Sequence, residues 1–196
     1  MQENDELRDR LGLIERMISE GRRETESWGW MFVLWGLVYY VAMAWSAWGH
    51  TGWAWPITMT IAVVATAVII AMRPESHVTT LGRAIGSIWT AAGISMFLLF
   101  PALGFSGRLG DQHVFVAVVS AILGMANGAS GLLLRWKVQF GCAVIWWAAA
   151  VVSCFGNDEK TIFTFVVAIF LCQIVFGIYG MISGAQQRRR RGPVHA

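Results

Sequence analysis

The sequence predicts an all-α integral membrane protein: a bundle of six transmembrane helices with both termini in the cytoplasm, preceded by a cytoplasmic amphipathic helix. Two observations support this fold class. Of the 196 residues, 56% are hydrophobic and only 14% are charged, with a mean hydropathy of +0.55, whereas soluble domains carry about 25% charged residues. Stretches of about 20 residues without a charge, the length that spans a bilayer core as a helix, recur six times along the chain.

Residues 1–26 form a charged leader in front of the transmembrane domain at 27–184 and a basic tail at 185–196. The leader carries apolar side chains spaced by four, three and four residues, which is typical of one face of a helix: Leu7, Leu11, Ile14 and Ile18. It holds eight acidic residues against five arginines. Helices that lie on anionic lipid are rich in Lys and Arg. We therefore expect residues 5–26 to bind a second copy of the chain or a cytoplasmic protein.

The first predicted span, residues 28–48, carries an aromatic stripe at helical spacing: Trp28, Phe32, Trp35 and Tyr39. The stripe is in heptad phase with the apolar face of the leader, interrupted only at Gly21 and Thr25. If leader and span form one unbroken helix, they share one contact surface for a partner or an oligomer. Gly21 weakens that expectation, because an interior glycine costs a helix about 1 kcal/mol relative to alanine.

Five further spans are expected at 54–72, 84–103, 114–134, 138–155 and 161–182. Pro56 falls in a first helical turn, where its missing N–H is harmless, and Pro101 falls near the end of its span. None of the six spans contains Asp, Glu, Lys, Arg or His. Because proton relays and ion pathways use such residues, their absence argues against a proton-coupled pump.

The basic residues predict the orientation. With the N-terminus inside, all of the fifteen Lys and Arg residues except Arg108 and Lys160 lie in the cytoplasm, as the positive-inside rule requires. The protein is therefore expected in the inner membrane of a bacterial-type cell, multi-pass, in contact with the lipid bilayer. The run Arg188, Arg189, Arg190 and Arg191 would anchor this topology and contact lipid headgroups. Nothing folded presents this run, so nucleic acid is not an expected partner.

A layer of polar and aromatic residues is expected near the middle of the bilayer: Asn127, Trp146, Trp147 and Gln173. A tryptophan at mid-depth needs an acceptor for its N–H, and an amide can supply one. The layer would either join helices by hydrogen bonds or line a pocket for a small neutral ligand. Gln139, next to Lys137, marks a helix end at the membrane boundary.

No motif for an enzyme, a metal site or a cofactor is found, so a non-enzymatic protein without metal or cofactor is expected. Cys142, Cys154 and Cys172 all lie in apolar runs and are expected to serve in packing. His50 and His113 fall at the outer ends of spans and leave open a haem or quinone protein, although Asp111 is the only neighbouring acid that could orient them.

The sequence thus predicts an oligomeric scaffold or membrane-bound regulator that acts through its N-terminal helix. The alternative is a small channel or transporter for a neutral or apolar solute, which uses the mid-depth layer.

Overall fold

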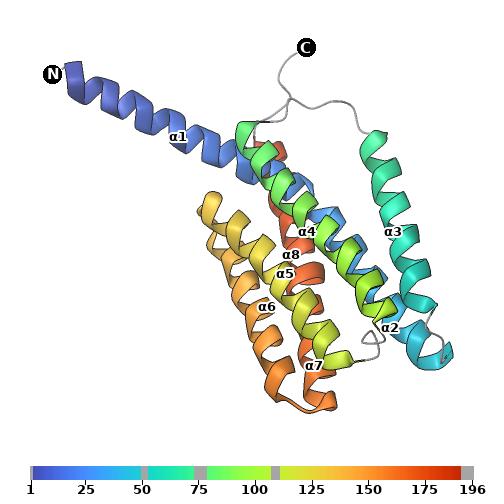
Figure 1. The fold of residues 1–196 in the computed structure, drawn as a ribbon. Coiled ribbons are helices and arrows are strands. Elements are labelled where there is room, and N and C mark those ends of the chain that lie inside the picture. The colour runs from blue at the N-terminus through green and yellow to red at the C-terminus, as the bar shows by residue number, and fades with distance from the viewer. Residues whose placement is uncertain (1, 50–52, 73–78, 107–110, 191–196) are drawn as a thin grey trace. The chain divides into compact units, whose positions relative to one another are not determined.

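The computed structural model describes residues 2–49, 53–72, 79–106 and 111–190, and these residues form helices without any strand. In chain order the elements are α1 (Gln2–Ser27), α2 (Gly29–Gly49), α3 (Ala54–Ala71), α4 (Thr80–Phe105), α5 (Gln112–Leu133), α6 (Lys137–Phe155), α7 (Asp158–Ile169), the π-helical segment η1 (Phe170–Val175) and α8 (Phe176–Arg190) (Figure 1). Counting α7, η1 and α8 as one helix, the described residues contain six helices long and apolar enough to cross a membrane. The architecture is therefore that of a multi-pass membrane protein.

The chain divides into two compact units. Unit 1 comprises residues 1–25 and 78–165, and unit 2 comprises residues 26–77 and 166–196. Each unit is assembled from segments far apart in the sequence, and each is described here by itself.

The core of unit 1 is the antiparallel pair α5 and α6 (Figure 1). Glycines on α5 bring the two helices close together. A methyl group added at Gly131 would lie 2.7 Å from the backbone nitrogen of Phe140, and one at Gly128 would lie 2.9 Å from the ring of Trp147. Such small residues allow membrane helices to pack closely, which increases dispersion contacts where no hydrophobic driving force exists between helices.

A tight turn at residues 134–136 joins α5 to α6. Arg135 has a positive φ of 49°, and the N–H of Trp136 donates to the carbonyl of Gly131 at 2.8 Å. This is the usual way in which a left-handed residue closes the end of a helix, except that an arginine occupies the position where glycine is favoured. Three residues therefore suffice to reverse the chain.

Helix α1 ends at Ser27, Trp28 forms a turn, and α2 begins at Gly29. Regular helical structure is thus interrupted at the boundary between leader and first span, so the two are separate helices. The interruption lies just beyond the boundary between the two units, which falls after Thr25. A single contact surface that runs from the leader into the first span would have required one unbroken helix, and the structure instead has two, α1 and α2.

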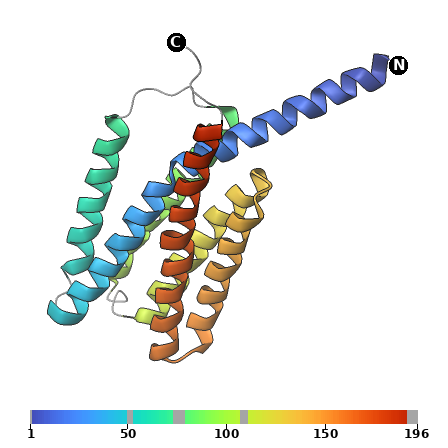
Figure 2. The same ribbon diagram turned by 180° about the vertical axis from the view of Figure 1, so that it is seen from behind.

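Unit 2 is organised around α2, which packs on α3 and on α8 (Figure 2). A Cβ at Gly29 would lie 2.6 Å from the carbonyl oxygen of Gly177, and a Cβ at Gly177 would lie 2.7 Å from that of Gly29. The two backbones therefore touch. Deeper in the unit, Gly36 faces the π-helical segment, where its Cβ would lie 2.8 Å from Cβ of Gln173. The hydroxyl of Tyr40 donates to the carbonyl of Val166 at 2.9 Å.

Candidate functional site

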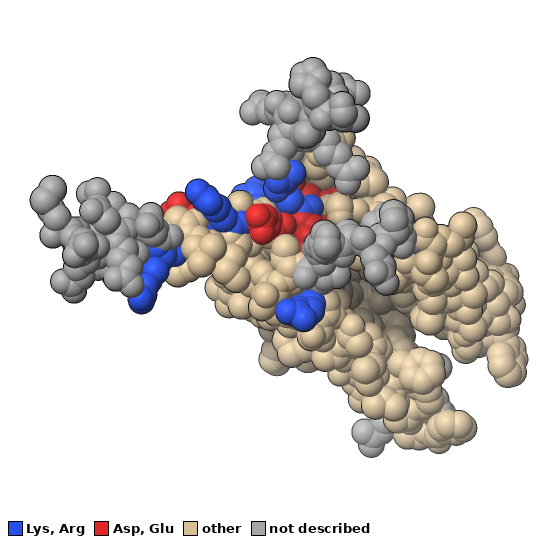
Figure 3. All heavy atoms as spheres, turned by 90° about the horizontal axis from the view of Figure 1, so that it is seen from above, with Lys and Arg blue, Asp and Glu red and all other residues tan. Residues whose placement is uncertain are grey.

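The apolar face of α1 is open to solvent along residues 10–17. Leu11 is 60% exposed, Ile14 is 51% exposed and Met17 is 40% exposed, so none of them is covered by the rest of the described chain. Leu7 belongs to the helix, but its side chain lies outside the described part, and Ile18 is half-buried. Acidic and basic side chains lie next to one another along the described part of α1 (Figure 3). Apolar residues that stay exposed in this way are typical of a docking surface.

The far end of α1 is fixed on unit 1. A methyl group at Gly21 would lie 2.7 Å from Cδ2 of Leu81 and 3.1 Å from Cδ2 of Leu134. Gly21 and Thr25 are buried. These are the two positions at which the apolar pattern of the leader is interrupted, and the missing side chain at Gly21 lets α1 approach α4 and the α5–α6 turn. The interruption therefore marks the place where the helix docks on its own chain.

Two polar contacts reinforce this attachment. The guanidinium carbon of Arg22 lies 4.9 Å from the ring centroid of Trp136, a cation–π contact. The hydroxyl of Thr79 donates to Oε2 of Glu24 at 3.0 Å and also caps α4 by accepting from the N–H of Gly82 at 3.0 Å. The attached end thereby holds the exposed half of α1 away from the packed helices of its own unit.

The aromatic stripe of α2 has partners inside unit 2. Phe32 packs edge-on against Phe176 with 5.1 Å between ring centroids, and Tyr39 lies 6.1 Å from Trp55. Phe32 and Tyr39 are buried, while Trp28 and Trp35 are half-buried. The described contacts of Phe32 and Tyr39 are therefore intramolecular, in contrast to the open face of α1.

Two of the predicted mid-depth residues, Asn127 on α5 and Trp146 on α6, are completely buried in unit 1. The amide nitrogen of Asn127 donates to the carbonyl of Leu123 at 2.9 Å. Its Oδ1, and Nε1 of Trp146, have no hydrogen-bond partner among the described residues. A buried polar atom without a partner costs about 1–3 kcal/mol, so each of these atoms requires an explanation.

Three more buried side chains on the same two helices share this property, and none of them was predicted from the sequence as a site residue. They are Ser120, Ser130 and Gln139, whose hydroxyl or amide atoms have no partner among the described residues. Gln139 is completely buried and lies in the first turn of α6, where the sequence predicts the membrane boundary. A signal was available: Gln139, Trp146 and Ser153 are seven residues apart on α6, and Ser120 and Asn127 are seven apart on α5.

The other two residues of the predicted layer are placed elsewhere. Trp147 is partly exposed and packs its ring on Gly124 and Gly128, on the flank of α6 that faces α5. Gln173 belongs to unit 2 and lies in the π-helical segment. The structure therefore brings Asn127 and Trp146 into one unit and gives Trp147 a different packing role.

His113 lies at the start of α5 in a polar cluster. Its Nε2 is 2.7 Å from Oδ1 of Asp158, and its Nδ1 is 2.9 Å from the carbonyl oxygen of Ser153 and 3.2 Å from the hydroxyl of Thr161. The side chain of Asp111 instead caps α5 by accepting from two backbone N–H groups. The acid that orients His113 is thus Asp158, 45 residues away in the chain, and not its neighbour Asp111. His50 lies outside the described residues.

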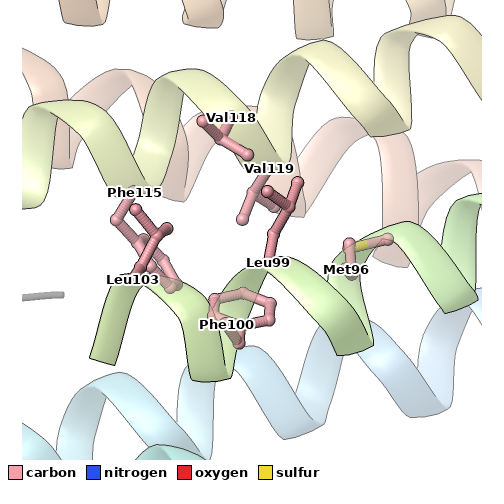
Figure 4. Close-up of a pocket in the computed structure, with 7 residues that line it drawn as sticks. All are labelled: Met96, Leu99, Phe100, Leu103, Phe115, Val118 and Val119. Atoms are coloured by element: carbon pink, nitrogen blue, oxygen red, sulfur yellow. The ribbon is translucent and has the colours of Figure 1, made fainter. Parts of the chain in front are cut away.

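A small cavity lies between α4 and α5. Phe100 and Leu103 of α4 face Phe115 and Val119 of α5 across it (Figure 4). Its volume is about 10 Å³ and its lining is apolar, so it is too small for any ligand larger than one water molecule. This cavity carries no binding site.

The tail arginines lie at or beyond the limit of the description. Arg188, Arg189 and Arg190 belong to α8, but their side chains are outside the described part, as is all of Arg191. Among the described residues no three His, Cys, Asp or Glu side chains gather in a way that could hold a metal ion. Comparison with protein-family models, curated proteins and solved structures finds no match to this chain.

Proposed function

We propose that the protein is a non-enzymatic inner-membrane scaffold or membrane-bound regulator that assembles through α1, and that the partner of α1 is the same helix of a second copy. One observation carries the proposal: α1 packs on unit 1 at Gly21, while Leu11, Ile14 and Met17 remain exposed. An exposed apolar face on a helix fixed at one end supports docking in preference to a role in the fold of its own chain.

The charges beside the apolar face support a second copy as the partner. With Leu7 and Ile14 at heptad positions d, and Leu11 and Ile18 at a, Arg10 falls at g and Glu15 at the following e. In a parallel two-stranded coiled coil, g of one helix meets the following e of its partner. Arg10 would then meet Glu15 of the second copy, and the sequence repeats this complementarity one heptad earlier with Glu3 and Arg8.

The apolar face of α1 is short, and this is why assembly is expected to depend on the membrane. Residues 7–18 provide two heptads, whereas a stable coiled coil in solution needs about three or four. The next two positions in the same heptad phase, Gly21 and Thr25, are already buried within the protein. Anchoring in the same bilayer raises the effective concentration of two α1 helices. We therefore expect full-length protein in membranes to associate and an isolated α1 peptide to remain monomeric.

Cysteine crosslinking tests the proposal. In a chain whose three native cysteines are replaced by alanine, Ile14→Cys should form a disulfide-linked dimer in membranes under mild oxidation, because equivalent d positions face each other in a parallel pair. Ser19→Cys is the matched control: it is exposed on the same helix but falls at an outward b position. A monomeric Ile14→Cys product, or equal crosslinking at Ser19, contradicts the proposal.

The proposed location is the inner membrane of a bacterial-type cell with both termini in the cytoplasm. The support is the distribution of Lys and Arg, which places only Arg108 and Lys160 on the outer side. In this orientation α1 and the arginine tail lie on the same side of the bilayer, and the tail is proposed to contact lipid headgroups.

A second candidate function, passage of a small neutral solute, is supported by the unpartnered buried atoms of Asn127 and Trp146. Asn127→Leu or Gln173→Leu should then abolish solute flux into vesicles while leaving the helix content unchanged. If these variants alter only thermal stability, the buried polar residues serve in packing and the transport function is wrong.

A further inference from the structure

The buried polar residues of unit 1 lie along one flank of the α5–α6 pair. Contacts of Gly128 with Ala143 and of Gly131 with Phe140 set the antiparallel register of the two helices. By this register Asn127 and Trp146 lie within one helical turn of each other in depth. Helical angles of 100° per residue place both on the same side of the plane through the two helix axes. Trp147, which packs on Gly124 and Gly128, lies on a different face of α6.

The two side chains have complementary hydrogen-bonding groups that do not meet. Oδ1 of Asn127 can only accept, and Nε1 of Trp146 can only donate. Both side chains are completely buried, and no hydrogen bond between the two atoms is found in the structure. The amide nitrogen of Asn127 already donates to the carbonyl of Leu123. This bond fixes the direction of the side chain.

We propose that a hydroxyl-bearing molecule binds between Asn127 and Trp146 on this flank, and that in the membrane this molecule is water. The bridging group must donate a hydrogen bond to Oδ1 of Asn127 and accept one from Nε1 of Trp146. A hydroxyl does both, whereas a carbonyl, an ether or a cation does only one. Buried waters usually satisfy otherwise unpaired polar groups in this way.

The neighbouring polar groups extend the same site. Gln139 and Ser130 lie nearer the α5–α6 turn and are buried with unpartnered amide and hydroxyl atoms, so they can hold further hydroxyl groups. Gln139 and Trp146 are seven residues apart, about 10 Å along the helix. This distance exceeds a single hydrogen bond, so we assign separate bound molecules to the two levels and not a continuous proton wire. The inference does not depend on α1 or on the proposed assembly.

Solid-state NMR of the full-length protein in lipid vesicles tests the proposal directly. The chain contains three asparagines, Asn4, Asn127 and Asn157. Changing the exposed Asn157 and the leader Asn4 to Asp leaves Nδ2 of Asn127 as the one ¹⁵N signal in perdeuterated protein that is labelled only at the side-chain nitrogen of asparagine. Magnetisation transfer from the water line to this amide is the expected result. Transfer from a non-exchanging proton identifies an organic alcohol or a lipid hydroxyl instead, which overturns water as the occupant. Transfer from neither overturns the site.

A double-mutant cycle tests the coupling of the two groups. Asn127→Leu and Trp146→Phe should each lower the midpoint of thermal unfolding by about 2–4 °C, and the double variant should lose no more than either single variant, because the bridge is already gone. Trp147→Phe is the matched control, which removes an indole N–H from the adjacent residue, and its effect should add to that of Asn127→Leu.

Additive effects of Asn127→Leu and Trp146→Phe overturn the bridge. Coupling without transfer from water or ligand shows a direct bond, which also overturns it. Should a variant fail to fold, the NMR measurement still decides, because it leaves Asn127 and Trp146 unchanged.

Discussion

At the scale of single residues, glycine decides how closely the helices approach. The same residue type has opposite roles at different positions of one hairpin. At Gly131 a side chain would meet the backbone of Phe140, which cannot move aside without shifting α6. At Gly141 nothing lies within 4 Å of an added Cβ, so this position keeps only the conformational cost of a glycine inside a helix. The spacing of glycines in the sequence does not distinguish the two cases.

Exchanging these two glycines for alanine should therefore change stability in opposite directions. We expect Gly131→Ala to lower the free energy of unfolding by about 1–3 kcal/mol, the usual cost of overpacking. Gly141→Ala should raise it by up to about 1 kcal/mol, because alanine is the better helix former. Thermal unfolding followed by circular dichroism in detergent micelles measures both. Equal effects of the two variants would show that α5 and α6 are not in contact at Gly131.

At the scale of elements, α1 has two distinct halves. Gly21 in its C-terminal part packs on unit 1 and Thr25 there is buried, while the part from Arg10 to Met17 is exposed. The seven-residue spacing runs through both halves, so the spacing alone could not tell which part contacts the chain itself and which part remains available. The absence of a side chain at Gly21 made the difference, because it allows Leu81 and Leu134 to approach.

Charge reversal on the exposed half tests the direction of pairing. In a parallel homodimer Arg10→Glu or Glu15→Arg alone places like charges opposite each other twice, and each reversal should weaken association by about 1 kcal/mol, roughly five-fold. The double variant Arg10→Glu/Glu15→Arg exchanges the charges and should restore association. Chemical crosslinking of the purified protein in nanodiscs or vesicles, at low salt, measures the dimer fraction.

The outcome of the double variant is decisive for this pairing. If it stays as weak as the single variants, the two residues do not meet across a parallel interface. The Ile14 crosslink would then have to be interpreted with a different partner geometry.

At the scale of the whole molecule, the last membrane helix takes part in both units. Residues 158–165 belong to unit 1, whereas the chain from residue 166 onward belongs to unit 2. Its π-helical segment begins a few residues after this boundary, at Phe170. Helices α4, α5 and α6 belong to unit 1, and α2 and α3 to unit 2. All six spans must cross the same bilayer. The side of the membrane on which each loop lies can therefore be tested residue by residue.

Thiol labelling in intact cells tests the proposed topology. In the chain with its native cysteines replaced by alanine, Glu159→Cys, in the exposed first turn of α7, should react with a membrane-impermeant maleimide from outside. Ser19→Cys on α1 should react only after the cells are permeabilised. The opposite pattern would place the N-terminus outside. Labelling of both from outside would put Ser19 and Glu159 on one side of the membrane, which contradicts the odd number of spans between them, α2 to α6.

The membrane class and the helices followed from the sequence alone, because both depend on local properties. Six apolar stretches of sufficient length appear as six long helices, since a bilayer leaves the backbone of a spanning segment no alternative to internal hydrogen bonding. Proximity between distant residues could not be predicted this way. Asp158 lies beside His113, Leu134 lies beside Gly21, and Gln139 is completely buried.

The tertiary structure also decided which predicted contact residues remain open. Phe32 and Tyr39 are in heptad phase with Leu11, but Phe32 and Tyr39 are buried on Phe176 and Trp55 while Leu11 and Ile14 are exposed. Periodicity states which side chains share a face of a helix, and only the packed chain determines what covers that face. For this protein the sequence by itself determined the membrane helices and the apolar face of α1. The tertiary structure decided that this face stays exposed at Leu11 and Ile14, because the described contacts of α1 with its own unit lie in its C-terminal part, at Gly21, Arg22 and Glu24.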